Sequence, residues 1–310
     1  MLEAVELTKR FKKNQVVNGL NLFIEKGETV GLLGPNGAGK STAISMISTL
    51  MSPTDGDVRL KNESVLGNPQ SLRNILGVVP QEIALYTDLT AKENLEFFGR
   101  INHLKGKLLK ERVNEVLDQI GLTDRKNDIV KTFSGGMKRR LNIGVALLHE
   151  PEILIMDEPT VGIDPQSRSY ILEQVKRLNQ EKNMTIIYTS HYMEEVEFLC
   201  DRIYIMDKGQ IIASGTKDEI KSILSSESTI VIKLEKMVPS FVEGLSTIPS
   251  VKNVTFADKE IILVIPKEQN LFNQIFQLAE DTGAVILSID RKTPSLEDVF
   301  LHLTGRALRD

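Results

Sequence analysis

Eight consecutive residues, Gly34-Pro-Asn-Gly-Ala-Gly-Lys40-Ser41, combine three glycines with a lysine and a hydroxyl. They match the pattern G-x-x-x-x-G-K-[ST], in which backbone N–H groups and the lysine surround phosphate oxygens. A buried strand predicted at 29–33 and a helix predicted at 41–51 supply the flanking elements that the motif requires. A glycine-rich turn with a solvated lysine is the alternative, and this context disfavours it. The predicted nucleotide-binding residues are Gly34, Pro35, Asn36, Gly37, Ala38, Gly39, Lys40, Ser41 and Thr42.

Each polar group of this turn has a chemical task. The glycines let the backbone approach the phosphates closely, and the helix start adds partial positive charge. Lys40 would neutralise the β- and γ-phosphates, the Ser41 hydroxyl would bind Mg²⁺, and Thr42 would add a hydroxyl near the α-phosphate. The turn therefore predicts a site for a nucleotide with Mg²⁺.

Two acidic residues, Asp157 and Glu158, end a predicted strand at 153–156. A buried strand does not leave charge without a partner, so a cation or a reacting group is expected beside them. Asp157 would hold Mg²⁺, mostly through water, and Glu158 would accept the proton of an attacking water. An acidic pair that only caps the turn before Pro159 is the alternative. A base at Glu158 therefore extends the prediction from nucleotide binding to nucleotide hydrolysis.

Strands and helices alternate through residues 1–220, which predicts an α/β fold with a largely parallel sheet. Together with the phosphate-binding turn, this order resembles that of a P-loop NTPase with a RecA-like core. Strands are expected at 153–156 and 185–189. The segment at about 89–150 is almost wholly helical, with clear amphipathic stretches at 91–101 and 108–120, and we interpret it as an inserted helical subdomain.

The pattern changes in residues 226–310, which we assign to a second, α+β domain. Strands are predicted at 229–234, 251–256, 261–265 and 284–289, with helices at 240–245 and 271–279. Their order is βαββαβ, a ferredoxin-like arrangement. Thr293 followed by Pro294 predicts the cap and first turn of a last helix through Leu303. An accessory or dimerisation role is expected for this domain, with ligand sensing as the alternative.

The composition excludes some classes of protein. With 38 basic and 42 acidic residues the net charge is −4, so no overall positive field draws the chain onto nucleic acid. No apolar run approaches the roughly 20 residues that cross a bilayer. Charges at Glu3, Glu6 and Lys9 argue against a signal peptide. The single cysteine, Cys200, is expected to be a buried structural thiol.

The segment Phe133-Ser134-Gly135-Gly136-Met137 opens a predicted helix and precedes the two acidic residues. Together with Phe11, Gln81, Asp164 and His191, which follow in order along the chain, it makes residues 1–220 resemble the ATP-binding cassette (ABC) family. Taken singly, Gln81 and His191 are typical of a solvated surface and Phe11 of a core or edge aromatic. Because these residues occur along the chain in the order found in the ABC family, their family roles are favoured over these single-residue interpretations.

The resemblance implies a role for each of these residues. Phe11 would stack on adenine, Gln81 would reach Mg²⁺ and the attacking water, and His191 would contact the γ-phosphate and orient Glu158. Ser134, Gly135 and Gly136 would contact the ATP of a second subunit in a head-to-tail dimer, with Asp164 at the interface. Met137 replaces the glutamine of the commonest signature, which removes one amide that could contact the ribose. The basic residues that follow, Lys138, Arg139 and Arg140, fit either a solvated helix face or a role at the signature helix.

The tail Thr293-Pro-Ser-Leu-Glu-Asp-Val-Phe-Leu-His-Leu-Thr-Gly305 and the βαββαβ region resemble the extension of drug-, sodium- and antibiotic-export ABC ATPases. The resemblance implies an ATPase that pairs with a copy of itself or with a homologous subunit. This subunit would drive a separate integral membrane permease. The permease would hold it on the cytoplasmic side, at the inner face of the cell membrane. The groove beside Gln81, with residues 82–87, is the expected docking surface.

Two other functions are compatible with parts of the sequence. A cassette ATPase that acts on nucleic acid or the ribosome would carry a coiled-coil insertion, a second cassette or a basic face, and none of these is found in the sequence. A nucleotide-gated regulator that scarcely hydrolyses is disfavoured by Glu158 and His191. No nucleic-acid partner is expected.

Overall fold

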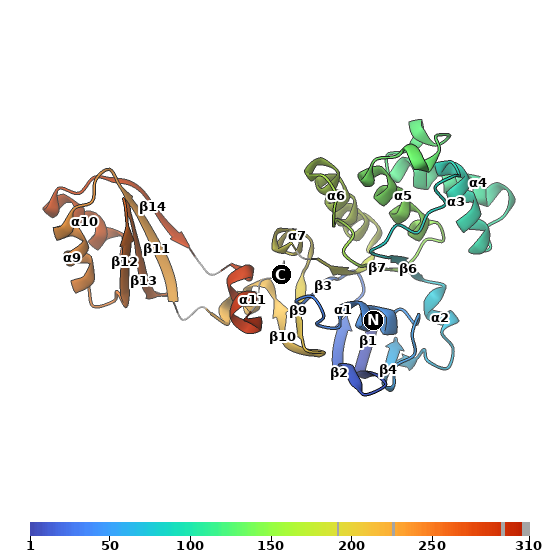
Figure 1. The fold of residues 1–310 in the computed structure, drawn as a ribbon, viewed down its shortest axis with the longest axis horizontal. Helices are drawn as coiled ribbons and strands as arrows, with labels where there is room; N and C mark the ends of the chain where they lie inside the picture. The colour runs from blue at the N-terminus through green and yellow to red at the C-terminus, as the bar shows by residue number, and fades with distance from the viewer. Residues whose placement is uncertain (191, 225–226, 293–294, 306–310) are drawn as a thin grey trace. The chain divides into compact units, whose positions relative to one another are not determined.

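The structure is a computed structural model, and it describes residues 1–190, 192–224, 227–292 and 295–305. The chain divides into two compact units, one formed by Met1–Lys217 together with the described residues 303–305, and the other by Asp218–His302. Each unit has a hydrophobic core of its own. Figure 1 labels their helices and strands.

A six-stranded sheet organises the first unit. Its strand order is β10-β9-β3-β8-β7-β6, and the pairs from β9 to β6 are parallel. The strands are β3 (Thr29–Leu33), β6 (Leu76–Val79), β7 (Ile153–Met156), β8 (Thr185–Thr189), β9 (Arg202–Asp207) and β10 (Gln210–Thr216). β3, β7 and β8 coincide with their predicted ranges, because each is a short, fully buried apolar run. The carboxyl ends of these parallel strands meet at one edge of the sheet.

A second sheet in this unit is antiparallel and did not follow from the sequence pattern. Its order is β2-β1-β4-β5, from β1 (Leu2–Phe11), β2 (Asn14–Ile24), β4 (Asp55–Leu60) and β5 (Glu63–Ser64). In β2 the buried residues alternate with exposed ones, as at Leu20, Leu22 and Ile24. This alternation is typical of a sheet with one solvated face, and the prediction of a largely parallel sheet overlooked it.

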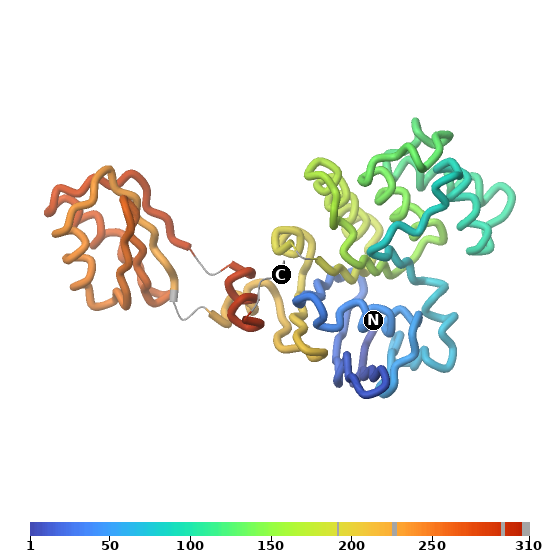
Figure 2. The backbone as a smooth tube through the Cα atoms, in the orientation of Figure 1, coloured from blue at the N-terminus to red at the C-terminus, as the bar shows by residue number. Residues whose placement is uncertain are grey.

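A helical segment leaves the six-stranded sheet after β6 and returns to it at β7, as the green part of the trace in Figure 2 shows. It contains α3 (Ala91–Ile101), α4 (Gly106–Gln119) and α5 (Gly135–Leu147), with short 3₁₀ turns at Thr123–Arg125 and Val130–Thr132. α3 has the predicted limits because Thr90 and Glu93 form a reciprocal capping box at its start. α4 begins two residues before its predicted range.

Four further helices belong to the described part of the first unit. They are α1 (Lys40–Ile47), α2 (Gln70–Arg73), α6 (Pro165–Lys182) and α7 (Met193–Leu199). α1 ends before the predicted Met51 because Thr49 adopts a positive φ of 58°, which a helix cannot continue. Cys200 follows α7 and is 1% exposed, as expected of a structural thiol, and burial raises the pKa of this thiol.

The second unit confirms the ferredoxin-like order. It runs β11 (Glu227–Leu234), α9 (Pro239–Thr247), β12 (Asn253–Ala257), β13 (Glu260–Pro266), α10 (Phe272–Thr282) and β14 (Ile286–Lys292), with α8 (Lys217–Ser222) before it and α11 (Leu296–Thr304) after it. The antiparallel sheet has the order β12-β13-β11-β14. α9 and α10 cover one face, where Phe241 and Ile275 are fully buried (Figure 1). The predicted hairpin turns at Asp258-Lys259.

The last helix begins later than predicted. Thr293 and Pro294 lie outside the described residues, and α11 begins at Leu296. Its cap is Ser295, whose hydroxyl accepts the N–H of Asp298 at 3.1 Å while the Asp298 carboxylate accepts the N–H of Ser295 at 2.8 Å. The sequence contains the spacing of this capping box, but the prediction followed the stronger signal of Thr293 and Pro294. Nowhere in the described residues is there a helix with the length and apolar character needed to span a membrane.

Candidate functional site

A polar cavity of about 390 Å³ lies where the strands β3, β6 and β7 end. The phosphate-binding turn forms one side of it, and side chains that follow β6 and β7 form the other. Its lining residues are Val16, Asn36, Gly37, Ala38, Gly39, Lys40, Ser41, Thr42, Gln81, Glu158 and Val161. Residues predicted from three separate sequence motifs therefore meet in one cavity.

The phosphate-binding turn depends on a left-handed backbone at the start of α1. Gly39 precedes the helix with a φ of 104°, and a Cβ placed there would lie 2.8 Å from the carbonyl oxygen of Val16. Only glycine meets both conditions without strain. The Lys40 side chain folds back over the turn and donates to the carbonyl of Gly34 at 2.7 Å. Burial lowers the pKa of Lys40, and the nearby charge of Glu158 partly offsets this effect.

Glu158 is a buried carboxylate, 6% exposed, held between two polar side chains. Its Oε1 lies 3.9 Å from the Lys40 ammonium, and its Oε2 accepts a hydrogen bond from the Gln81 amide at 3.0 Å. The backbone of Glu158 has a φ of 47°, an uncommon conformation for a residue with a side chain. Such strain occurs at functional sites that fix a side chain in place.

Thr189, at the end of β8, connects the two acidic residues. Its hydroxyl accepts the backbone N–H of Glu158 at 2.8 Å and donates to the Asp157 carboxylate at 2.8 Å. Thr189 was not among the residues predicted from the sequence. β8 lies next to β7, and the two acidic residues follow β7. A hydroxyl residue at the last position of β8 is the signal that could have identified Thr189.

The signature segment and Asp164 lie together but do not line the cavity. Ser134 caps α5 by accepting the N–H of Met137 at 3.2 Å, and Asp164 caps α6 by accepting the N–H of Ser167 at 2.9 Å. That hydrogen bond holds the pKa of the Asp164 carboxyl below its usual range. The starts of α5 and α6 touch, because a Cβ on Gly136 would lie 2.5 Å from the Cβ of Ser167.

Phe11 and His191, two of the predicted residues, are not placed in the cavity by the structure, and Gly34, Pro35 and Asp157 are not among its lining residues either. Phe11 ends β1, is 44% exposed and lies under the ammonium of Lys9, and it is not among the lining residues. Val16, on the neighbouring strand β2, lines the cavity and was missed, since an isolated valine carries no chemical signal. His191 lies outside the described residues.

A buried acid beside the site was also missed. Glu195, on α7, is 1% exposed and accepts hydrogen bonds from the hydroxyls of Thr160 at 2.7 Å, Tyr188 at 2.9 Å and Ser190 at 2.5 Å. Thr160 follows Glu158 by two residues, and Ser190 follows β8 directly. Burial and the charge of Glu195 raise the pKa of Tyr188. Glu195 was not among the residues predicted from the sequence.

Comparison with known proteins identifies the family. Residues 17–161 match the family described as ABC transporter, and residues 215–304 match the C-terminal domain of DrrA1-3-like ATP-binding proteins. The linearmycin resistance ATP-binding protein LnrL of Bacillus subtilis is 49% identical over 312 residues, covering 100% of both chains. The daunorubicin/doxorubicin resistance ATP-binding protein DrrA of Streptomyces peucetius is 34% identical, covering 100% of this chain and 94% of that protein. The chain belongs to the ABC transporter family.

A solved structure agrees with this result. The ATP-binding cassette MJ0796, a dimer bound to ADP and phosphate, superposes with a TM-score of 0.64 at 28% identity, covering 70% of this chain and 98% of that one. The chain is therefore an ATP-binding, ATP-hydrolysing subunit of an ABC transporter, a class in which cassettes form dimers and pair with membrane permeases. The names of these relatives refer to drug resistance and ATP binding, and none refers to nucleic acid or the ribosome.

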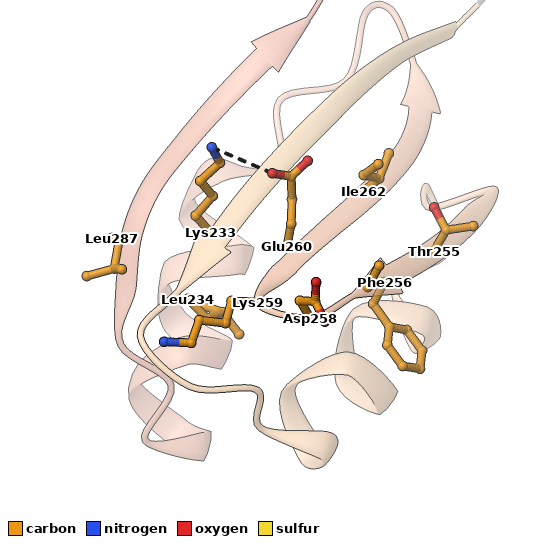
Figure 3. A pocket seen from close by; sticks show the side chains of 10 residues that line it. Lys233, Leu234, Thr255, Phe256, Asp258, Lys259, Glu260, Ile262 and Leu287 are labelled. Carbon is orange, nitrogen blue, oxygen red and sulfur yellow. Dashed lines mark ion pairs between the residues drawn. The ribbon is translucent and has the colours of Figure 1, made fainter.

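A larger cavity, of about 550 Å³, lies in the second unit of this ABC ATPase, around the turn between β12 and β13 (Figure 3). Lys233 and Glu260 form an ion pair of 3.6 Å there, and Figure 3 shows Phe256 and Leu287 pointing away from each other. These side chains do not converge on a common point. By its chemistry, the smaller cavity of the first unit is therefore the candidate nucleotide site.

Proposed function

We propose that this chain hydrolyses ATP to drive a drug- or antibiotic-exporting permease. The observation that carries the hydrolytic part is the placement of Glu158 between Lys40 and Gln81 at the wall of the cavity. Export is supported by the full-length similarity to two resistance ATP-binding proteins, which extends through residues 215–304. The proposed boundaries are residues 1–220 for the cassette and 226–310 for the accessory domain.

The residues of the cavity support a division of labour on ATP. The N–H groups of the turn 34–41 and the Lys40 ammonium would bind the phosphates, with Thr42 near the α-phosphate and Phe11 on the adenine. Glu158 would accept the proton of the attacking water, which Gln81 would help to orient. His191 would contact the γ-phosphate. Lys40 would exchange its carbonyl partners for phosphate oxygens, a stronger, charge-assisted contact.

The oxygen-rich residues beside the phosphates fit Mg²⁺. Ser41 offers a hydroxyl and Gln81 an amide oxygen, and Asp157 has a carboxylate oriented by Thr189. Mg²⁺ prefers such hard oxygen ligands and binds through one or two carboxylates together with substrate phosphates. No cluster of three or more His, Cys, Asp or Glu side chains occurs among the described residues, so the protein alone supplies no cage. Bound Mg²⁺ would neutralise charge that develops on the phosphates.

A second subunit would complete each site. Ser134, Gly135, Gly136 and Asp164 lie at the touching starts of α5 and α6, outside their own cavity, as residues that face a partner's ATP would. The subunits would associate head to tail, as two copies of this chain or as a pair with a homologous subunit. ATP binding would close the dimer and hydrolysis would open it.

The permease would dock at an exposed aromatic patch beside Gln81. Tyr86 is 50% exposed, and its ring lies 4.8 Å from that of Phe97 and 6.0 Å from that of Phe98. Ile83 adds exposed apolar surface on the same loop. Such patches on a folded protein mark interaction sites. Docking there would hold this subunit on the inner face of the cell membrane.

The substitution Glu158→Gln tests the hydrolytic role. It keeps the shape of the side chain and removes the base, so we expect kcat for ATP to fall about 10²–10³-fold while ATP still binds. Hydrolysis by the purified full chain and binding of a fluorescent ATP analogue are the two measurements. Glu152→Gln, at an exposed residue before β7, is the matched control. Sustained turnover in Glu158→Gln would remove Glu158 from the mechanism.

The transport role is tested by isolating the tagged chain from membranes of its own cell. An integral membrane protein should co-purify with it, and Tyr86→Ala together with Phe97→Ala should weaken that association without loss of ATP binding. Isolation with only ribosomes or DNA would contradict the proposal.

A further inference from the structure

The loop of residues 80–87, between β6 and α3, is exposed, yet buried polar side chains of two helices hold its backbone. At its start, Arg139 of α5 donates to the carbonyl oxygens of Pro80 at 2.7 Å and Gln81 at 2.5 Å. Near its middle, the amide oxygen of Asn142, also on α5, accepts the N–H of Ala84 at 3.3 Å.

The end of the loop is held by α3. Asn94, which is fully buried, accepts the N–H of Tyr86 and donates to its carbonyl, both at 2.9 Å. The exposed loop is thus fixed at both ends, and α5 sets the position of the end that carries Gln81.

Arg139 is unusual because it is a cation buried to 3% exposure with no carboxylate partner among the described residues. Burial lowers the pKa of its guanidinium. Burying an unpaired charge is unfavourable, and an apolar or amide side chain would fill the same space at lower cost. What the guanidinium offers is a rigid planar fork that reaches two successive carbonyl oxygens at once.

The position of Gln81 determines a contact in the hydrolytic site. The same residue whose carbonyl Arg139 binds donates its side-chain amide to Glu158 Oε2 at 3.0 Å. α5 is also packed closely on β6, because a Cβ on Gly77 would lie 2.6 Å from the carbonyl oxygen of Ala146. A change in the position of α5 therefore reaches Gln81 through Arg139.

We propose that Arg139 is a positioning residue that fixes the Gln81 backbone so that the Gln81 amide stays on Glu158. It connects the helix that begins at the signature serine, Ser134, to the hydrolytic carboxylate of the same subunit. The inference rests on the proposed function, because it assigns Glu158 and Gln81 their roles in hydrolysis. Arg139 itself does not touch ATP.

The first experiment compares Arg139→Lys with Arg140→Lys in the purified full chain. A lysine keeps the charge but replaces the planar two-nitrogen fork with a single nitrogen on a shorter side chain. We therefore expect kcat for ATP to fall about tenfold or more, since a misplacement of about 1 Å can cost 10²-fold. KM for ATP should change less than about twofold, because the phosphate contacts remain. Arg140 binds the carbonyls of Ile120 and Gly121 and lies over Tyr170, so its variant should match wild type.

A double-mutant cycle separates positioning from general damage. If Arg139 acts through Gln81, then Arg139→Lys should lower kcat no further in a Gln81→Ala background. Additive losses in kcat, or wild-type kcat in Arg139→Lys, would overturn the inference. Arg139→Gln, which keeps a single donor nitrogen and no charge, replaces Arg139→Lys if thermal unfolding shows that the lysine variant does not fold.

Hydrogen exchange provides a readout that does not require ATP turnover. The backbone amides of residues 81–86 should exchange faster in Arg139→Lys than in Arg140→Lys, and those of α4 should not change. Equal exchange in the two variants would overturn the positioning role of Arg139 even if wild type hydrolyses ATP. A wild-type chain that neither binds nor hydrolyses ATP would instead refute the proposed function. Faster exchange in Arg139→Lys would still support the positioning role of Arg139.

Discussion

At the scale of single residues, the site depends on backbone conformations that few residues tolerate. Glu158 holds a φ of 47° while its N–H and side chain both have partners. A non-glycine residue in this region stores about 1–3 kcal/mol of strain, which the surrounding contacts must offset. The carboxylate is therefore fixed toward Lys40 before any substrate arrives, and in the proposed mechanism this would reduce the reorganisation needed during hydrolysis.

The two signature glycines should respond differently to alanine. A Cβ on Gly136 would meet the Ser167 side chain at 2.1 Å and 2.5 Å, so Gly136→Ala should lower the unfolding free energy by about 1–3 kcal/mol. A Cβ on Gly135 would meet nothing closer than Ile163 at 3.8 Å, so Gly135→Ala should leave stability intact. Chemical denaturation measures both.

Gly135→Ala has a second expected effect if this surface faces a partner's ATP. In a Glu158→Gln background it should prevent the ATP-dependent dimer, as followed by light scattering, because the added methyl would keep the phosphate away from the helix start. An unchanged dimer would show that Gly135 does not lie against the partner's nucleotide.

At the scale of elements, three fully buried strands of the first unit were predicted to the residue, whereas its antiparallel sheet was not predicted. β3, β7 and β8 are continuous apolar runs, and their ends carry the residues of the site. The antiparallel sheet of β1, β2, β4 and β5 mixes charged and apolar residues, so its pairing depends on distant partners that a local pattern does not contain. Arg139 illustrates the same limit, because only the packing of α5 against β6 reveals which carbonyls it meets.

The connection between α5 and β7 predicts a pH effect on stability. His149 has a ring nitrogen 3.1 Å from the carbonyl oxygen of Leu76, and burial lowers the pKa of this histidine. The unfolded chain then binds more protons than the folded chain below the unfolded pKa of about 6.5. Stability should therefore fall as the pH drops through that value and level off above it.

The substitution His149→Gln tests this effect. It should flatten the dependence of the unfolding free energy on pH between about pH 5 and about pH 7, because the titrating group is gone. His302→Gln, at an exposed position of α11, should leave the dependence as in wild type. Equal slopes in all three proteins would contradict the assignment to His149.

At the scale of the whole molecule, the chain has two units with separate cores, and the nucleotide cavity belongs entirely to the first. The sequence indicated both domains, because the motifs of the cassette end before the βαββαβ pattern begins. It did not place the cavity of the second unit, which is formed by the turn of one hairpin and the ends of neighbouring strands. No local sequence motif marks a cavity that is formed in this way.

Separate cores predict separate responses to ATP. In calorimetry of the Glu158→Gln chain, ATP with Mg²⁺ should raise the midpoint temperature of only the first unit's unfolding transition. With ATP at 100 times its dissociation constant, the unfolding free energy of that unit should rise by about 2.7 kcal/mol. The transition of the second unit should stay where it is. An equal shift of both, or one transition throughout, would mean that the two units unfold together.

The buried thiol makes this chain suitable for site-specific labelling. Cys200 is the single cysteine of the sequence, is 1% exposed, and has a raised pKa that keeps it protonated and unreactive toward maleimides. A cysteine introduced at the exposed Ile83 or Tyr86 would therefore react with a fluorophore or a cross-linker without removal of the native one. Motion of the loop beside Gln81 during turnover can thus be followed in a protein that differs from wild type at one position.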